Sequence, residues 1–443
     1  MSTSVSSTAQ IGGEPAELLR CRERDEGHQP WDRWGTYLSD RQWGTVREDY
    51  SGDGNAWNSF PFDHSHLRSY RWGEDGLLGL SDERCLLCFS PVLWNGKDSI
   101  LKERLFGLGN PEGNHGEDIK DTMYHLAGTP TGSYAKALYR YPHQSFPYQQ
   151  LRDENRNRSR EENEYELVDT GIFTGNRFFD LDVEYAKASP EDVLIRLTIT
   201  NRGPEDADLH LLPSLWFRNT WSWGDPDRNR PSLRLQDNRL VSDAVEGLAA
   251  YNLTCSEQGP WLFTENETNT ERLYGQAPEQ PYVKDAFHRF LIDGEQGAVN
   301  PAQTGSKAAL HLQRTLHPGE IWSVSLRLSR HDHQGSKAPE PEETAAFNTL
   351  MDQRRREWQD HLEWVAPGLN AEDRAIHASA AAGLFWCRKY YAWYVARWLR
   401  GDNNAPRPPQ ERWHTENAYW RTLRAQNIIS MPDCWEYPYF CQW

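Results

Sequence analysis

The chain has 443 residues, of which 37% are hydrophobic and 12% aromatic, with 20 Trp and 19 Tyr. This aromatic content excludes a wholly disordered chain, and the length gives room for two or three domains. The formal net charge of -17 at pH 7 repels phosphate backbones and anionic membranes, so we expect neither nucleic acid nor membrane as a partner.

The first thirty residues are polar, and we expect a flexible N-terminus over residues 1–30. The stretch Met1–Gly13 has neither the basic nor the apolar segment of a secretion signal. No apolar run approaches the ~18 residues of a membrane span. The 7 cysteines show no framework spacing. We therefore predict a cytoplasmic protein with reduced thiols.

Residues 31–335 show the pattern of many short strands. In the clearest strand, 192–200, apolar side chains alternate with a second face, and a turn follows at Asn201-Arg202-Gly203-Pro204. The next strand, 209–217, is expected to form a hairpin with it. Residues 322–329 alternate in the same way. Strands without intervening helices favour a large antiparallel β-sandwich.

Residues 336–370 are predicted to be a linker and a linker helix. Apolar residues recur at three and four positions from Phe347 to Val365, and Pro367-Gly368 ends the helix. A second helix is capped by Asn370 and runs to Gly401, and a third is expected near 411–428. The second helix carries more large aromatic side chains than the predicted helices can cover. These side chains are Phe385, Trp386, Tyr390, Trp393 and Trp398. Such rings need partners, so we expect residues 371–443 to form part of a larger helical domain.

A glycine-rich loop, 102–120, concentrates the side chains that hydrogen-bond sugar hydroxyls. Within it, His115, Glu117 and Asp118 are candidate substrate-binding residues. Their loose spacing is not that of a metal site, and the alternative is a structural loop held by internal hydrogen bonds. No Walker loop, GxGxxG or GxSxG frame is present, so we expect no metal and no cofactor.

The end of the sequence mixes acids and aromatic rings, as sugar subsites do. Trp435, Glu436, Tyr437 and Trp443 are the candidate substrate-binding residues there. The alternative is a buried aromatic turn. Because the sequence stops within an aromatic run, we expect it to end at the start of an active site.

Five stretches together resemble glycoside hydrolase family 63, the group of the processing mannosyl-oligosaccharide glucosidase, in its cytosolic bacterial and fungal branch. The resemblance extends from about Trp31 to Trp443. The stretches are Tyr70–Gly76, Lys102–Lys120, Tyr139–His143, Val395–Asp402 and Ile429–Pro438.

The resemblance implies a β-sandwich, a helical linker and a C-terminal (α/α)6 barrel that is incomplete in this sequence. It implies an inverting, exo-acting α-glucosidase of oligosaccharides, which uses one carboxyl as acid and one as base. In the family the acid is an Asp directly after the Trp matching Trp443, and the base is a Glu further along. The resemblance therefore assigns no catalytic residue here. The sequence also departs from its relatives at Tyr439, Cys441 and Gln442.

Three interpretations follow for a chain that we expect to be inactive alone. It is the N-terminal part of an α-glucosidase, a non-catalytic carbohydrate-binding remnant, or a partner that completes a split hydrolase with a separate chain carrying the rest of the barrel.

Overall fold

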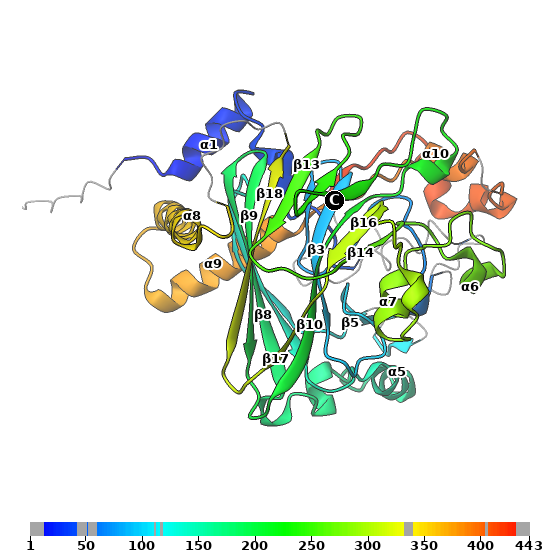
Figure 1. Cartoon of the computed structure of the whole chain (residues 1–443), viewed down its shortest axis with the longest axis horizontal. Coiled ribbons are helices and arrows are strands. Elements are labelled where there is room, and N and C mark those ends of the chain that lie inside the picture. The colour runs from blue at the N-terminus through cyan, green and yellow to red at the C-terminus, as the bar shows by residue number, and fades with distance from the viewer. Residues whose placement is uncertain are drawn as a thin grey trace, which may run out of the picture.

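A computed structural model describes residues 13–41, 51, 60–109, 112–115, 118–331, 340–403 and 406–430. Two antiparallel sheets pack face to face, and helices cover the outside (Figure 1). The structure thus confirms the predicted combination of antiparallel sheets with helices.

The larger sheet has nine strands in the order β15-β11-β12-β13-β18-β9-β8-β7-β6. In chain order they are β6 Met123–Gly128, β7 Tyr134–Pro142, β8 Phe178–Ser189, β9 Asp192–Asn201, β11 Leu233–Gln236, β12 Arg239–Ser242, β13 Tyr251–Cys255, β15 Thr304–Gly305 and β18 Ile321–Arg330.

The smaller sheet has seven strands in the order β1-β2-β3-β10-β16-β14, with β17 also paired to β10. They are β1 Trp34–Gly35, β2 Leu80–Asp82, β3 Leu87–Trp94, β10 Ala207–Phe217, β14 Trp261–Thr264, β16 Lys307–Leu310 and β17 Leu312–Leu316. Two further pairs lie outside these sheets, namely β4 Gly107–Leu108 with β5 Asp118–Ile119 and β19 Arg388–Tyr390 with β20 Asn427–Ile429.

The main core lies between the two large sheets, and the predicted strands build it. The alternating apolar side chains of β9 and β18 are all buried there, as the period of two requires. Leu194 of β9, on the opposite face, is also buried, because Phe347 and Met351 of α8 (Thr344–Val365) cover it.

The predicted hairpin between 192–200 and 209–217 is wrong. β9 pairs with β8 and β18, whereas β10 lies in the other sheet and pairs with β3, β16 and β17. Asn201 shapes the connection, because its side-chain amide donates to the carbonyls of Glu205 and Leu316 at 2.8 Å each. The turn residues thus make an arch between sheets instead of a hairpin.

Part of the N-terminal segment expected to be flexible forms helix α1 (Ala16–Asp25). The buried carboxylate of Glu17 accepts hydrogen bonds from Thr131 and Ser133, in the turn between β6 and β7. Arg20 pairs with Glu357 of α8. These contacts attach α1 to both the sandwich and the linker helix.

The linker helix is confirmed as α8, which ends at Val365 before Pro367-Gly368. The Asn370 cap is also confirmed, because its side chain accepts from the amide of Asp373. The continuous helix to Gly401 is wrong. α9 (Ala371–Trp386) ends early, β19 follows, and α10 (Val395–Arg400) is short.

The expectation that the rings of 385–398 lack partners is also wrong. Trp386, Tyr390, Trp393 and Trp398 are all buried. Trp386 belongs to the main core, where its indole Nε1 donates to the carbonyl of Ala127 at 2.9 Å. The expected helix near 411–428 is replaced by two 3-10 turns and β20.

The remaining helices are short and peripheral: α5 Tyr148–Asn157, α6 Thr270–Tyr274 and α7 Ala286–Leu291. Within the described residues, none of the helices is both long and apolar enough to cross a membrane.

Candidate functional site

The predicted loop is framed by the β4–β5 pair, and its described side chains make local contacts. Glu112 accepts from the amide of Gly109 and pairs with Arg152 of α5 at 3.0 Å. Asn114 donates to two carbonyls beyond α5, and the exposed His115 places Nε2 2.8 Å from the carbonyl oxygen of Glu162. These contacts match the structural-loop alternative for the described part.

The structure does not bring the predicted binding residues together. Glu117 lies outside the described residues, and only the backbone of Asp118, in β5, is within them. Trp435, Glu436, Tyr437 and Trp443 also lie outside the described residues. Their assignment to a sugar site stays a prediction.

The base of the loop is joined to a second stretch of the resemblance by a buried carboxylate. Asp121 accepts hydrogen bonds from the hydroxyl of Tyr139 at 2.7 Å and from the amide of Phe106 at 2.6 Å. The ammonium of Lys102 lies 3.3 Å from the same carboxylate and 3.8 Å from the ring centroid of Phe146. The stretches 102–120 and 139–143 therefore share one buried polar contact.

Next to it, one buried ion pair ties the loop to the smaller sheet, and a second ties it to the stretch 70–76. Glu103 lies 2.7 Å from Lys307 of β16, and Arg104 lies 2.9 Å from Asp75. Burial alone would raise the pKa of the Glu103 carboxyl, but Lys307, Arg104 and His288 outweigh it and hold that pKa well below its usual range. The carboxylate is charged, and it depends on its cations.

Glu74, the neighbour of Asp75, is also buried but has a different partner. It accepts a hydrogen bond from the side-chain amide of Asn266 at 2.8 Å. Burial raises the pKa of this carboxyl, and Lys284 and Asn266 only partly counteract the effect. Lys284 lies 4.0 Å from the ring centroid of Tyr70. The stretch 70–76 thus sits at the centre of a buried polar network.

Arg71 connects this network to the helical segment. Its guanidinium makes two hydrogen bonds to Asp402, at 2.7 and 3.0 Å, and lies 3.5 Å from the ring centroid of Trp223 and 4.3 Å from that of Trp72. Arg397 of α10 binds both Asp402, at 2.8 Å, and Asp225, at 3.1 Å. We call Arg71, Trp72, Trp223, Asp225, Arg397 and Asp402 the Arg71 junction.

The junction joins residues of the sandwich part of the chain to α10, and it is partly open to solvent. The side chains of Arg71 and Asp402 are 17% and 18% exposed, and Trp223 is half-buried. An aromatic face beside fixed donors and acceptors is suited to bind a sugar. Both carboxylates are occupied by arginines, so the junction offers binding groups and no free acid–base pair. In the described ranges, no group of three or more His, Cys, Asp or Glu side chains is placed to hold a metal ion.

Sequence reasoning missed the part of this junction that comes from Trp221–Asp225. The predicted strand ends at residue 217, and no role is predicted for Trp221-Ser222-Trp223-Gly224-Asp225, although it joins two indoles to a glycine and an acid. Gly224 has φ +72°, in the left-handed region, and closes the short η6 turn (Trp221–Trp223). Two indoles, a glycine and an acid within five residues were a sequence signal for this part of the junction.

Comparison with known proteins gives one clear relative. The chain is 38% identical to the uncharacterized protein YMR196W of Saccharomyces cerevisiae (strain ATCC 204508 / S288c) over an alignment of 479 residues. The alignment covers 96% of this chain and 43% of that protein. The chain therefore spans less than half the length of this relative. No family model matches.

Solved structures overlap only weakly with the chain. A putative kojibiose phosphorylase from the human microbiome has a TM-score of 0.26 at 7% identity, over 72% of this chain and 31% of that chain. A putative aldose 1-epimerase from Escherichia coli K12 has 0.21 at 8%, over 46% and 67%. A polysaccharide lyase has 0.25 at 10%, over 61% and 28%. Overlaps with TM-scores this low carry no argument about fold or function.

Proposed function

We propose that this chain forms the sandwich and the first helices of an inverting, exo-acting glycosidase of the α-glucosidase type that acts on oligosaccharides. One observation carries the proposal. The stretches that resemble glycoside hydrolase family 63 lie far apart in the sequence, but four of them, 70–76, 102–120, 139–143 and 395–402, are linked by contacts in the structure.

The contacts run in an unbroken series. Tyr139 reaches Asp121, which holds the 102–120 stretch, and Arg104 of that stretch pairs with Asp75. Arg71, four residues before Asp75, then binds Asp402 beyond α10. Contacts of this kind orient the helical segment relative to the sandwich. A fixed orientation of this segment supports the proposed (α/α)6 barrel, whose first helices are expected within residues 371–443.

The proposed sugar-binding groups are His115, Glu117 and Asp118 with Trp435, Glu436, Tyr437 and Trp443. We expect calorimetric titration of the 443-residue protein with maltose, kojibiose and nigerose to detect binding. Trp435→Ala should weaken it, because an aromatic face contributes most of the apolar contact with a pyranose. Glu117→Gln should weaken it less.

Trp364→Ala is the matched control, because Trp364 is an exposed indole on α8, 46% exposed. Unchanged affinity in Trp435→Ala and Glu117→Gln would place the site elsewhere. Absence of binding to all three disaccharides would contradict the proposed function.

The same protein should release no glucose from these disaccharides. An inverting enzyme needs an acid and a base about 6.5–9.5 Å apart, and the resemblance assigns neither to this sequence. Turnover at ~1–10³ s⁻¹, as ordinary enzymes show, would mean that carboxyls of this chain already form such a pair.

A further inference from the structure

A cavity of about 440 Å³ opens beside the strands β3 and β10, away from the loop discussed above. Four arginines line it: Arg84, Arg218, Arg228 and Arg230. We call it the Arg218 cavity. A cluster of four guanidinium groups is unexpected in a chain whose formal net charge is -17. Its volume is in the range of small-molecule sites.

Arg218 is the most deeply buried of the four arginines that line this cavity. It is only 5% exposed. Its Nε donates to the carbonyl of Cys85 at 3.0 Å, and Nη2 donates to the hydroxyl of Tyr390 at 3.2 Å. Nη1 is buried and has no acceptor among the described residues. A buried guanidinium with an unsatisfied nitrogen is costly unless a ligand or water provides an acceptor.

Arg84 also lines the cavity and is held by a backbone carbonyl. Its Nη1 donates to the carbonyl of Glu246 at 3.1 Å, next to Gly247. Gly247 has φ +85°, and a Cβ there would lie 1.9 Å from the same Nη1. Within the described part of the chain, no carboxylate oxygen lies within 4.0 Å of a nitrogen of Arg84 or Arg218. Neither arginine therefore forms a direct ion pair there, although Arg218 lies near enough to the buried carboxyls of Glu74 and Asp82 to interact with them electrostatically.

The other charged side chains around the cavity either form ion pairs or lie exposed at its rim. Arg228 pairs with Asp225 at 3.5 Å, and Arg230 pairs with Glu267 at 3.2 Å. Asp243 accepts from Arg234 at 2.5 Å.

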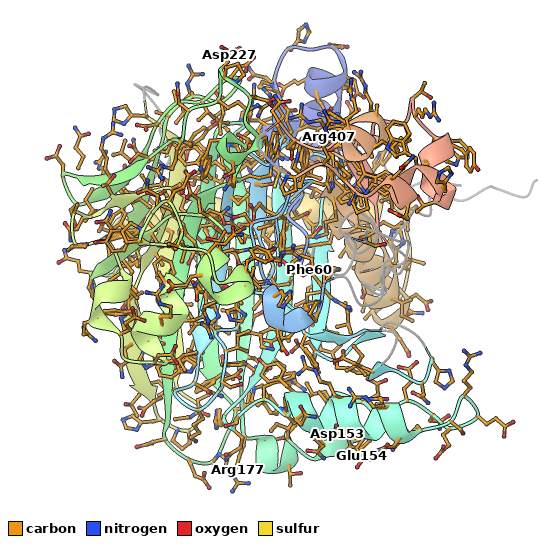
Figure 2. All side chains as sticks on the ribbon, turned by 90° about the vertical axis from the view of Figure 1, so that its right-hand side faces the viewer. Phe60, Asp153, Glu154, Arg177, Asp227 and Arg407 are labelled. Atoms are coloured by element: carbon orange, nitrogen blue, oxygen red, sulfur yellow. The ribbon has the colours of Figure 1, made fainter. Side chains whose placement is uncertain are left out.

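Two acids at the rim, Asp227 and Glu246, are exposed to solvent. Asp227 lies at the upper end of the molecule, opposite Asp153 and Glu154 of α5 (Figure 2). The cavity and the packing site of the 112–115 loop are therefore separate.

The cavity backs onto the Arg71 junction through one indole. The guanidinium of Arg228 lies 4.7 Å and that of Arg218 5.4 Å from the ring centroid of Trp223, which also stacks on Arg71. Stacking of this kind orders arginine side chains before a ligand arrives, which lowers the entropic penalty of binding.

We propose that the Arg218 cavity binds the oxyanion of a small organic molecule, a phosphate or a carboxylate on a ligand of about monosaccharide size. The oxyanion accepts from Arg218 and Arg84, whose planar donors match carboxylate and phosphate geometry. The remaining volume takes the body of the ligand. This inference stands without the proposed glycosidase function, since it depends on none of the predicted sugar-binding residues.

The test is calorimetric titration of the 443-residue protein at constant ionic strength with inorganic phosphate, glucose 6-phosphate and glucuronate, with glucose as the neutral control. We expect a dissociation constant of about 1 mM or tighter for at least one anion, and none of this signal for glucose. The preferred anion distinguishes phosphate from carboxylate ligands.

Arg84→Gln and Arg228→Gln are the decisive variants, because Arg84 is half-buried, Arg228 is exposed, and both should fold. We expect a loss of at least about tenfold in affinity for Arg84→Gln and a smaller loss for Arg228→Gln. Arg239→Gln, at an exposed arginine of β12 outside the cavity, should change nothing. The proposal is overturned if no anion binds, or if Arg239→Gln weakens binding as much as Arg84→Gln.

Discussion

The buried pair between Glu103 and Lys307 allows a quantitative test of what holds the loop to the smaller sheet. We consider Lys307→Met, which keeps a side chain of similar length and removes the ammonium. Lys307 is 4% exposed and Glu103 is 5% exposed, so water replaces little of the lost interaction. The variant leaves a buried carboxylate with Arg104 at 3.3 Å, and Arg104 is itself shared with Asp75.

Breaking a buried ion pair by removing one partner costs about 3–5 kcal/mol. The other neighbours of Glu103 reduce this only modestly, because His288 lies at 4.0 Å and is neutral at pH 7. We therefore expect Lys307→Met to lower the free energy of unfolding by about 3 kcal/mol, out of a total of ~5–15 kcal/mol for an ordinary domain.

Urea denaturation followed by far-UV circular dichroism gives the midpoint and the slope. The matched control is Lys136→Met, which breaks the pair between Lys136 and Asp182 at 3.0 Å, where the side chains are 30% and 21% exposed. That variant should lose only about 0–1 kcal/mol. Adding Glu103→Leu to Lys307→Met should restore most of the stability, since no unpaired charge then remains.

Two results would refute this reasoning. One is equal destabilisation by Lys307→Met and Lys136→Met, which would mean that burial of the pair is irrelevant. The other is a double variant as unstable as the sum of the two single variants, which would mean that the carboxylate and the ammonium are not coupled.

Three further predictions concern the core, the pH response and the junction. Trp386→Ala should cost about 3–5 kcal/mol and make residues 340–403 sensitive to limited proteolysis, whereas in the parent protein they should survive together with the sandwich. Burial lowers the pKa of His288 from 6.5 to about 3. Below pH 6.5 the unfolded chain therefore takes up a proton that the folded chain does not, and each pH unit should remove about 1.4 kcal/mol of stability until the folded pKa is reached. His288→Phe should make the dependence of the urea midpoint on pH between 6.5 and 4 less steep by the share of this one histidine, since burial also lowers the pKa of His66, His125, His143 and His210, and an unchanged slope would contradict the assignment. Arg71→Lys should cost about 1–3 kcal/mol, because an ammonium cannot bind Asp402 with two parallel hydrogen bonds while stacking on Trp223, and wild-type thermal stability in this variant would argue against the junction.

Strand positions could be predicted from the sequence, but strand partners could not. The alternation in 192–200 and 322–329 is a local signal, because it reports only which side chains face the core. The pairing of β9 with β18 instead of β10 depends on contacts between distant segments, such as the bond from the Asn201 amide to Leu316, 115 positions away. A contact at that separation leaves no periodic trace in the sequence.

The second helix shows a different limit. Ile376 and Leu384 recur at helical spacing with Cys387 and Tyr391, a pattern that predicts an inward face, yet they are 63% and 61% exposed, whereas Ala382, Gly383 and Trp386 are buried. With large apolar residues on both faces, the pattern could not decide the buried side. The decision comes from the sandwich, because Trp386 stacks on His125 of β6 with ring centroids 4.9 Å apart.

The candidate site was predictable only in its outline. The resemblance marked the stretches that contain Arg71, Arg104 and Asp402, but it gave no role for them. Their roles depend on ion pairs between separate segments, which are 29 positions apart for Arg104 with Asp75 and 331 positions apart for Arg71 with Asp402. The described polar groups of the loop are mostly bound to other protein groups, such as Glu103 to Lys307 and Asn114 to two carbonyls after α5, so its composition alone suggested more chemistry than its described contacts show.

The insertion of Trp386 into the main core has a consequence for how the protein is made. Ribosomes deliver the chain from its N-terminus, and early domains generally fold as they emerge. The strands of the sandwich are complete at Arg330, yet the cluster that they enclose also contains Ala382 and Trp386. The nascent sandwich must therefore keep one end of its core open while more than 50 further residues are translated. During that interval the hydrophobic edge beside β6 is the surface on which chaperones should act.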